Sequence, residues 1–231
     1  MIPWLTDELI FPPITHALRS PNGLLAAGGD LSSARLLRAY QAGIFPWSSH
    51  DEPLLWWSPD PRMILMPTEF KISHSLSKIL HQKKFEVRCD TAFEQVMRAC
   101  AAPRDEHGGT WIDERMVSAY CILHQLGYAH SVEIWQAEKL VGGLYGVSIG
   151  RMFYGESMFS LVSNASKVAL AHLSGQLTRW EFGMIDCQMH TPHLASLGAR
   201  TMPRQEFIAR VQDLVKYPPI TSWQFDADLF T

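Results

Sequence analysis

Two polar clusters on either side of one expected helix contain the side chains best suited to chemistry. The first holds Glu156 and leads into the helix-starting pair Asn164 and Ser166. The second is Asp186-Cys187-Gln188, at the end of an apolar run. An α/β enzyme brings polar side chains together at one edge of its sheet in this way. The pattern predicts an enzyme.

Asp186 and Gln188 are two residues apart on an expected strand, so their side chains should face the same side while Cys187 faces the other. At the end of a strand such a pair suits an active site, although both groups would also serve to satisfy loop backbone. Glu156 is expected where a strand passes into a loop, either as a functional carboxylate or as a solvated acid. Asn164 and Ser166 are expected as helix caps, and the same helix N-terminus would suit a carbonyl or anionic oxygen.

Metal and thiol chemistry are not expected. Cys187, His190 and His193 have types that zinc binds, but Pro192 lies between the two histidines and no fourth ligand is evident. Cys187 is a weak candidate nucleophile because no base is assigned to it. No metal and no cofactor are therefore predicted.

Composition narrows the class of protein. The chain has 231 residues, 47% of them hydrophobic and 19% charged, which predicts an ordinary globular protein. The net charge of -3 excludes a globally basic nucleic-acid binder, so any RNA contact must come from a local patch. The four cysteines form no CxxC pair, and no signal peptide or apolar run of membrane-spanning length is evident. A cytoplasmic protein, independent of membranes and monomeric, is expected.

Basic and aromatic residues supply two candidate RNA contacts. The stretch from Lys71 to Arg88 is basic, and its alternatives are a solvated helix face or a set of phosphate contacts. Trp47 follows a proline and Trp111 follows a glycine-containing loop. Each indole is either core or a surface that stacks on a base, a contact worth about 1–3 kcal/mol. The candidate phosphate-binding residues are Lys78, Lys83, Lys84 and Arg88.

A small N-terminal domain, residues 1–62, is expected first. Its pattern indicates loops, short strands and one helix that begins near 31–33, with Asp30 or Ser32 as cap, and stops near Gly43. Pro59 and Pro61 then forbid a helix and indicate a rigid connector. The boundary is placed after residue 62 for this reason.

Residues 63–231 are expected to form an α+β domain with a mixed sheet. A capping box is expected at Thr91-Ala92-Phe93-Glu94. Three consecutive strands, a helix and a further strand give an order that resembles the acyltransferase (GNAT-like) fold. The expected strands are 63–66, 85–89, 131–135, 140–147, 151–155 and 184–188. The expected helices are 73–84, 91–100, 166–180 and 204–216, with a further helix inside 112–127 that a glycine ends.

A series of motifs follows in order along nearly the whole chain. They include Gly43-Ile44-Phe45-Pro46-Trp47, Trp56-Trp57-Ser58-Pro59-Asp60-Pro61-Arg62, Gly109-Thr110-Trp111-Ile112, Gly155-Glu156-Ser157-Met158-Phe159-Ser160, Asn164-Ala165-Ser166-Lys167 and Asp186-Cys187-Gln188. Together these segments resemble the leucyl/phenylalanyl-tRNA–protein transferase family. The resemblance implies a cytoplasmic enzyme that moves Leu, Phe or sometimes Met from aminoacyl-tRNA onto proteins with N-terminal Lys or Arg. The product would carry an N-degron for proteolysis.

The resemblance also implies roles for residues. Trp47 and Trp111 match the aromatic residues that hold the terminal adenosine of the tRNA, and Asp186, Gln188 and Glu156 match the polar centre that receives the acceptor amine. The positions that match the apolar amino-acid pocket are Leu144, Phe153, Met158, Leu170, Leu173, Leu177 and Ile185. Leu173 and Leu177 stand where aromatics are expected in close relatives, so the pocket could be reshaped.

Two other functions stay open on the sequence. An acyl-CoA acetyltransferase would need a Q/R-x-x-G-x-G/A loop before the helix at Ser166, and the chain lacks it. A non-catalytic RNA-binding module would not need an acidic centre beside an apolar pocket. Within the transferase interpretation, the proton of the attacking amine passes either through Gln188, oriented by Asp186, or through the ribose hydroxyl of the tRNA.

Overall fold

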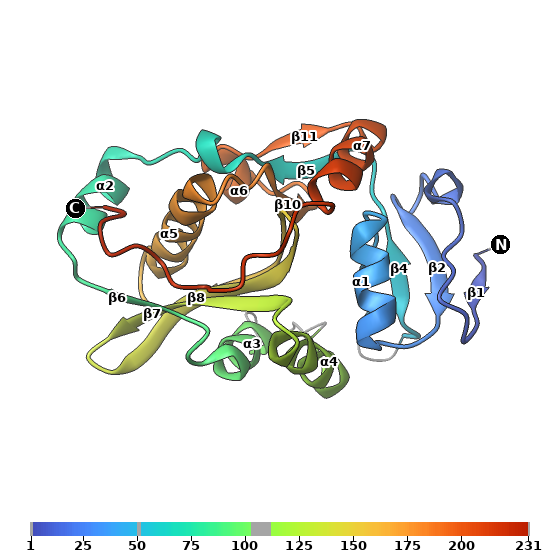
Figure 1. The fold of residues 1–231 in the computed structure, drawn as a ribbon, viewed down its shortest axis with the longest axis horizontal. Coiled ribbons are helices and arrows are strands. Elements are labelled where there is room, and N and C mark those ends of the chain that lie inside the picture. Colours follow the sequence, from blue (N-terminus) through green and yellow to red (C-terminus); the bar gives the residue numbers. More distant parts are fainter. Residues whose placement is uncertain (1, 50–51, 103–111, 231) are drawn as a thin grey trace.

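Two β-sheets organise the chain. The computed structural model describes residues 2–49, 52–102 and 112–230, and within these ranges one sheet has four strands and the other seven. The smaller sheet has the order β1-β2-β4-β3, built from β1 (Trp4–Leu5), β2 (Leu24–Gly28), β4 (Leu55–Trp57) and β3 (Phe45–Pro46). It lies to one side of the larger sheet (Figure 1). The expected α+β class with a small N-terminal unit is confirmed.

Helix α1 (Ser33–Gln41) joins the two parts. Ser32 is its N-cap, as expected, and its side chain accepts a hydrogen bond from the backbone N–H of Arg35. Gly43 follows the helix with a φ of 71, a conformation that glycine adopts without strain. Figure 1 shows α1 standing between the small sheet and the rest of the chain. Leu36 and Tyr40 on this helix are fully buried.

The larger sheet has the order β11-β5-β10-β9-β8-β7-β6. Strands β7, β8 and β9 form an antiparallel meander, and β10 pairs parallel to β9 and antiparallel to β5. The bounds are β5 (Arg62–Leu65), β6 (Glu86–Cys89), β7 (Ala129–Gln136), β8 (Lys139–Ile149), β9 (Met152–Ser160), β10 (Met184–Gln188) and β11 (Arg200–Met202).

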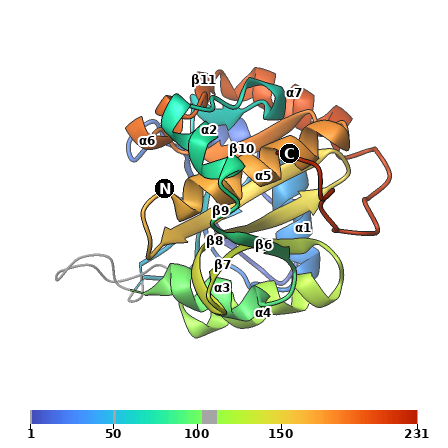
Figure 2. The same ribbon diagram turned by 90° about the vertical axis from the view of Figure 1, so that its left-hand side faces the viewer.

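Helices cover both faces of this sheet (Figures 1 and 2). Helices α2 (His74–His81) and α5 (Ala165–Arg179) pack with one apolar cluster, and α3 (Phe93–Ala101) and α4 (Glu114–Gln125) pack with another. The second cluster also includes α1 and the small sheet, so apolar packing is continuous across the expected boundary at residue 62. That boundary, which falls after the first residue of β5, stays a prediction.

Helices α6 (Pro192–Ser196) and α7 (Arg204–Leu214) follow β10 along the chain. Helix α6 and strand β11 were not expected from the sequence.

A β-bulge decides where Glu156 points. Tyr145 pairs with Ser157 and Gly146 pairs with Gly155, so Glu156 is the extra residue on β9. The expectation that Glu156 lies in a strand-to-loop transition is therefore wrong, because β9 continues to Ser160. The bulge shifts the alternation: Glu156 contacts α1 and α4, whereas Met158 packs with the α5 cluster. Without the extra residue, positions 156 and 158 would face the same side.

Two expected helix caps are also wrong. Helix α3 begins at Phe93 with Ala92 as N-cap, and the Glu133 carboxylate on β7 accepts the backbone N–H groups of Thr91 and Ala92, each at 2.9 Å. Asn164 precedes α5 with a φ of 69 and makes no side-chain cap, while Ser166 lies within the helix. In the first case a carboxylate distant in sequence replaces the local capping box.

None of the described helices is both long and apolar enough to cross a membrane.

Candidate active site

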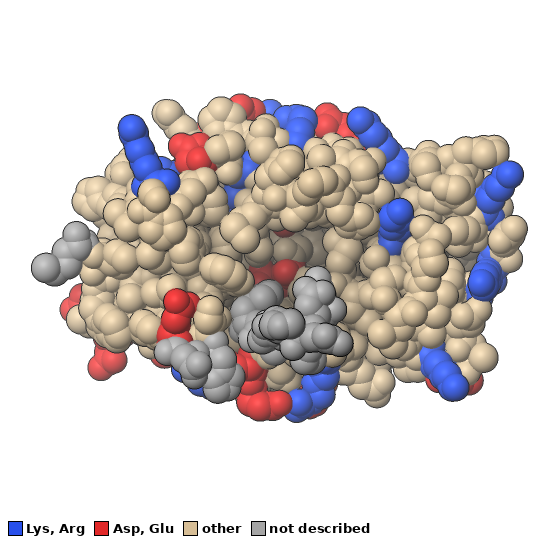
Figure 3. Space-filling view, turned by 180° about the vertical axis from the view of Figure 1, so that it is seen from behind, with Lys and Arg blue, Asp and Glu red and all other residues tan. Residues whose placement is uncertain are grey.

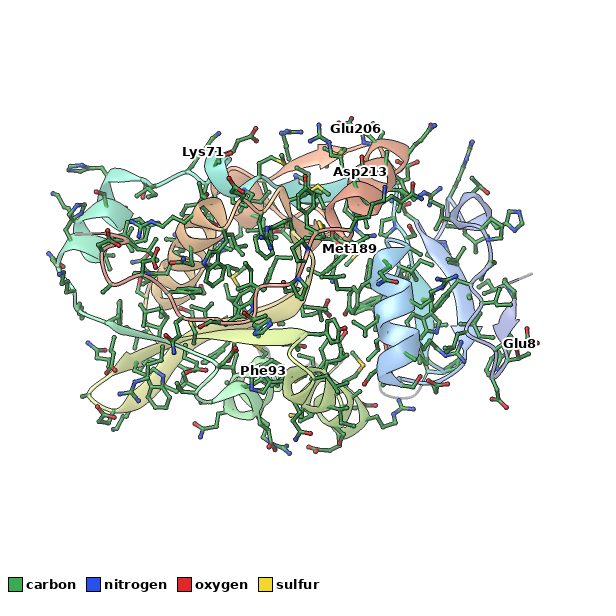
Figure 4. All side chains as sticks on the ribbon, in the orientation of Figure 1. Glu8, Lys71, Phe93, Met189, Glu206 and Asp213 are labelled. Atoms are coloured by element: carbon green, nitrogen blue, oxygen red, sulfur yellow. The ribbon has the colours of Figure 1, made fainter. Side chains whose placement is uncertain are left out.

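The candidate site lies where strands β9 and β10 part. Their ladder ends at the pair Asp186 and Tyr154, whereas β9 continues to Ser160 and β10 to Gln188. Glu156 therefore lies beside the end of β10, where its carboxylate contacts Gln188. Figure 3 shows a hollow in the middle of one face of the molecule with acidic atoms at its base. Met189, the neighbour of Gln188, marks this region in Figure 4.

Asp186 is held by a buried arginine that the sequence did not single out. Arg62 Nε donates to Asp186 Oδ1 at 2.8 Å and Nη2 donates to Oδ2 at 2.7 Å. Arg62 is 1% exposed and Asp186 0%. The guanidinium also lies 4.7 Å from the ring centres of both Phe45 and Phe207. A bidentate pair of this kind fixes the carboxylate in orientation as well as in position.

Arg62 was predicted only as the end of a proline-rich connector. Its Nη1 donates to the Gly43 carbonyl at 3.3 Å, so one side chain links β5, the end of α1 and β10. The sequence shows an arginine at the last position of the Trp56–Arg62 motif, which could have indicated a functional role. It does not show the partner, because Asp186 is 124 residues away.

Gln188 has a strained backbone that Asp186 supports. Its φ is 62, in the left-handed region that non-glycine residues seldom adopt. Its backbone N–H donates to Asp186 Oδ1 at 2.9 Å, and the pairing with β5 is irregular between the two residues. The strand-alternation argument does not apply across this irregularity. The hydrogen bond, not the strand period, couples Asp186 to Gln188.

Two buried tyrosines and Gln188 surround the Glu156 carboxylate. Tyr40 Oη donates to Oε1 at 2.8 Å, Tyr120 Oη donates to Oε2 at 3.2 Å, and Gln188 Nε2 donates to Oε1 at 3.1 Å. The two tyrosine hydroxyls also contact each other. Tyr40 was expected only as an apolar helix residue and Tyr120 was not noted. Both tyrosines could have been noticed in the sequence, because a tyrosine at a buried helix position carries a hydroxyl that needs a hydrogen-bond partner.

Burial raises the pKa of Glu156 to about 7. Hydrogen bonds from Tyr40 and Tyr120 oppose this shift, Asp186 adds to it through like charge, and Arg62 opposes it. Burial likewise holds the pKa values of the Tyr40 and Tyr120 hydroxyls well above their usual range. Glu156 is therefore roughly half ionised near neutral pH, and both tyrosines remain donors.

This shift makes stability depend on pH. Between pH 4.5 and 7, folded Glu156 keeps a proton that the unfolded chain has lost, so the free energy of unfolding falls as pH rises through this window. The loss attributable to Glu156 is about 3 kcal/mol. We expect urea denaturation at closely spaced pH values to show this fall in the unmodified chain and a flatter curve in Glu156→Gln. Parallel curves for the two proteins would contradict the shift.

The seven residues that match the apolar pocket lie in one cluster on the α5 side of the sheet. Six are at most 4% exposed, and Met158 is partly buried against them. They come from β8, β9, β10 and α5, and are Leu144, Phe153, Met158, Leu170, Leu173, Leu177 and Ile185. The structure thus brings them together in one apolar cluster, on the face of the sheet that α5 covers.

The expected RNA-contacting residues have different surroundings. Trp47 is half-buried, with its ring 5.5 Å from that of Trp57, and Trp111 lies outside the described residues. Lys78, Lys83 and Lys84 are exposed in and after α2.

Arg88 differs from these lysines because its charge is already engaged. It forms ion pairs with Glu86 and Glu138, and its guanidinium lies 4.8 Å from the Trp135 ring centre.

The surroundings of Cys187 favour neither a nucleophilic thiolate nor a metal site. Burial raises the pKa of the Cys187 thiol, which disfavours the nucleophilic thiolate. Among the described residues, metal-ligand spacing occurs at Asp90, His124 and His130, not at the Cys187 motif. Two of these ring nitrogens are engaged: His130 Nδ1 lies 2.7 Å from Asp90 Oδ2, and His124 Nδ1 lies 2.8 Å from a backbone carbonyl oxygen.

Sequence comparisons match nearly the whole chain. A family described as "Leucyl/phenylalanyl-tRNA protein transferase" matches residues 64–212, and its N-terminal domain matches residues 29–60. A leucyl/phenylalanyl-tRNA–protein transferase of Nitrosospira multiformis is 60% identical over 227 residues, covering 98% of each chain. The protein of the same name from Chromobacterium violaceum is 59% identical and covers 97% of each chain.

Solved structures are more distant. A structure of L-PGS from Bacillus licheniformis aligns with a TM-score of 0.38 and 11% identity, covering 74% of this chain and 57% of that one. A GCN5-related N-acetyltransferase from Kribbella flavida aligns with a TM-score of 0.36 and 10% identity, covering 72% and 60%. Likeness at this level carries no argument about activity.

Proposed function

Because the chain belongs to the leucyl/phenylalanyl-tRNA–protein transferase family, we propose that it moves Leu or Phe, and sometimes Met, from aminoacyl-tRNA onto proteins that begin with Lys or Arg. It is an aminoacyltransferase. The modified protein then carries an N-degron for proteolysis in the cytoplasm. The observation that carries the proposal is an acidic, amide-containing centre beside a cluster of apolar side chains, at the point where β9 and β10 part.

The reaction is aminolysis of an ester. The acceptor's α-amine attacks the carbonyl carbon of the aminoacyl ester, and the tRNA ribose oxygen leaves after a tetrahedral intermediate. A free α-amine has a pKa of about 7.7–8.0, so roughly a tenth is already neutral near pH 7. Positioning of the two reactants supplies about 7–11 kcal/mol when their geometry is well fixed. A strong base is therefore not required.

We propose that the side-chain carbonyl of Gln188 accepts a hydrogen bond from the attacking amine. Its Nε2 donates to Glu156, which directs the amide, and its Oε1 has no hydrogen-bond partner among the described residues. Asp186 accepts the Gln188 backbone N–H and so holds this orientation. The competing route passes the proton through the ribose hydroxyl of the tRNA, with the protein only positioning the reactants.

Glu156 suits a cationic acceptor. A positive charge within about 4–6 Å favours the ionised form of a carboxyl group. The pKa of Glu156 stands at about 7, so binding of a cationic acceptor end would shift this group toward the carboxylate. The centre would then gain negative charge as the acceptor binds. A neutral N-terminal residue would offer less of this attraction.

The donor amino acid would occupy the apolar cluster on the α5 side of the sheet. The residues around Phe153 and Leu177 suit a Leu or Phe side chain. Trp47, half-buried against Trp57, would hold the terminal adenosine together with Trp111. The exposed Lys78, Lys83 and Lys84 suit phosphate contacts. Arg88 suits them less because two glutamates already pair with it.

Transfer to defined peptides tests this function. We expect the protein, incubated with Leu-tRNA, to extend a peptide that begins with Arg, and not the same peptide with an acetylated N-terminus. A peptide beginning with Ala should react more slowly. Binding of tRNA without any peptide product would favour an RNA-binding module instead. Equal reaction of the Arg and Ala peptides would contradict the proposed acceptor preference.

A further inference from the structure

The last residues of the chain form a strap across the molecule. Residues 217–230 contain no helix or strand and run from α7 along α5 toward α2 (Figures 1 and 2). We call this segment the C-terminal strap. Asp226 fastens it to α5: its backbone N–H donates to Gln176 Oε1 at 2.8 Å, and its carboxylate accepts from Arg179 at 2.8 Å. The family match ends at residue 212, before the strap begins.

Trp223 is the buried anchor of the strap. It is 8% exposed and belongs to the same apolar cluster as the seven residues matched to the pocket. Its ring stacks on His130 of β7, with centroids 3.8 Å apart and planes 12° from parallel. The ring of Trp180 meets it edge-on at 5.1 Å. Large aromatic contacts of this kind dominate the energy of the segments they anchor.

His130 is itself fixed in orientation. Its Nδ1 lies 2.7 Å from Asp90 Oδ2 and its Nε2 lies 3.2 Å from the Gly127 carbonyl oxygen. Because both ring nitrogens are engaged, the ring cannot turn without breaking one of these contacts. The stack therefore gives Trp223 a rigid support on the sheet.

Phe153 connects Trp223 to the pocket positions. The two ring centroids are 5.9 Å apart, and Phe153 is 1% exposed. Cores are packed densely enough that removing a large side chain is felt by its neighbours. A smaller residue at position 223 would leave space behind Phe153, into which that ring could move.

We propose that Trp223 is a specificity-determining residue that sets the depth of the donor amino-acid pocket through Phe153. This inference rests on the proposed function, since it takes the cluster around Phe153 as the donor pocket. Trp223 acts as a positioning residue: the indole backs the Phe153 ring and limits how far it retreats when a large donor side chain enters. A shallow pocket favours Leu over Phe.

Competition between donors tests the proposal. For Trp223→Leu we expect the ratio of kcat/KM for Phe-tRNA to that for Leu-tRNA to rise about tenfold, the scale of a methylene-sized change in an apolar pocket. The KM for an Arg-initiated peptide should stay unchanged. Trp223→Phe keeps a ring against His130 but is smaller than the indole, so we expect a smaller rise in the ratio that still exceeds the ratio of the control. Phe225→Leu is the matched control, because Phe225 lies on the same strap and contacts Trp180.

The outcomes separate this inference from the proposed function. If the unmodified protein transfers neither Leu nor Phe, the proposed function fails. If it transfers both, but Trp223→Leu lowers the two rates by the same factor or Phe225→Leu changes the ratio equally, the role of Trp223 is wrong. Should Trp223→Leu not fold, Trp223→Phe carries the test. Its ratio must then exceed that of Phe225→Leu, and equal ratios overturn the proposal.

Discussion

Arg62→Met lowers the free energy of unfolding by about 3–5 kcal/mol, the usual cost of removing one partner of a buried ion pair. The reason is that Asp186, 0% exposed, would lose the guanidinium that now donates to both of its oxygens and would be left buried without a partner of opposite charge. Methionine fills much of the space between Phe45 and Phe207, so lost packing contributes less than lost charge. Urea denaturation followed by circular dichroism measures the difference.

A surface arginine provides the matched control. Arg98 pairs with Glu94 and Glu114 but is 49% exposed, so Arg98→Met should lower the free energy of unfolding much less than Arg62→Met does. The double variant Arg62→Met with Asp186→Leu should recover most of the stability, because well-packed apolar residues often replace a buried ion pair without loss. Equal losses for Arg62→Met and Arg98→Met would show that the buried pair does not stabilise the fold.

Gln188→Met lowers the single-turnover rate of transfer by about 10²-fold at saturating donor and acceptor, the lower end of what proton-transfer groups contribute. Methionine keeps the length of the side chain but loses both the amide that binds Glu156 and the oxygen proposed to meet the amine. Gln125→Met, at the exposed end of α4, is the control and should leave the rate unchanged. A near-normal rate for Gln188→Met would instead support proton transfer through the tRNA ribose.

Asp186 can be tested in the same assay without the complication of an unpaired Arg62. In Arg62→Met with Asp186→Leu the fold is expected to survive, but the Gln188 N–H loses its acceptor. The single-turnover rate should then fall about as far as in Gln188→Met. Near-normal transfer by this double variant would mean that Asp186 serves stability and does not position Gln188.

Local patterns in the sequence predicted most of the elements of the fold. The apolar periodicities gave the helices at α1, α2, α4 and α5 and the strands β7, β8 and β10 close to their observed bounds. The residue types before the apolar run limited the cap of α1 to Asp30 or Ser32, and the structure has Ser32. These features depend on neighbours a few residues apart, so they are visible in sequence. α6 and β11 are short, and their patterns were too brief to be recognised.

The sequence by itself determined which residue types were available: Glu156, Asp186 and Gln188, together with motifs in the order typical of one family. The tertiary structure decided how they are connected. The bulge in β9 turns Glu156 toward Tyr40, 116 residues away, and Arg62 reaches Asp186 across 124 residues. Such contacts depend on strand register and on packing between distant elements, which no local pattern encodes.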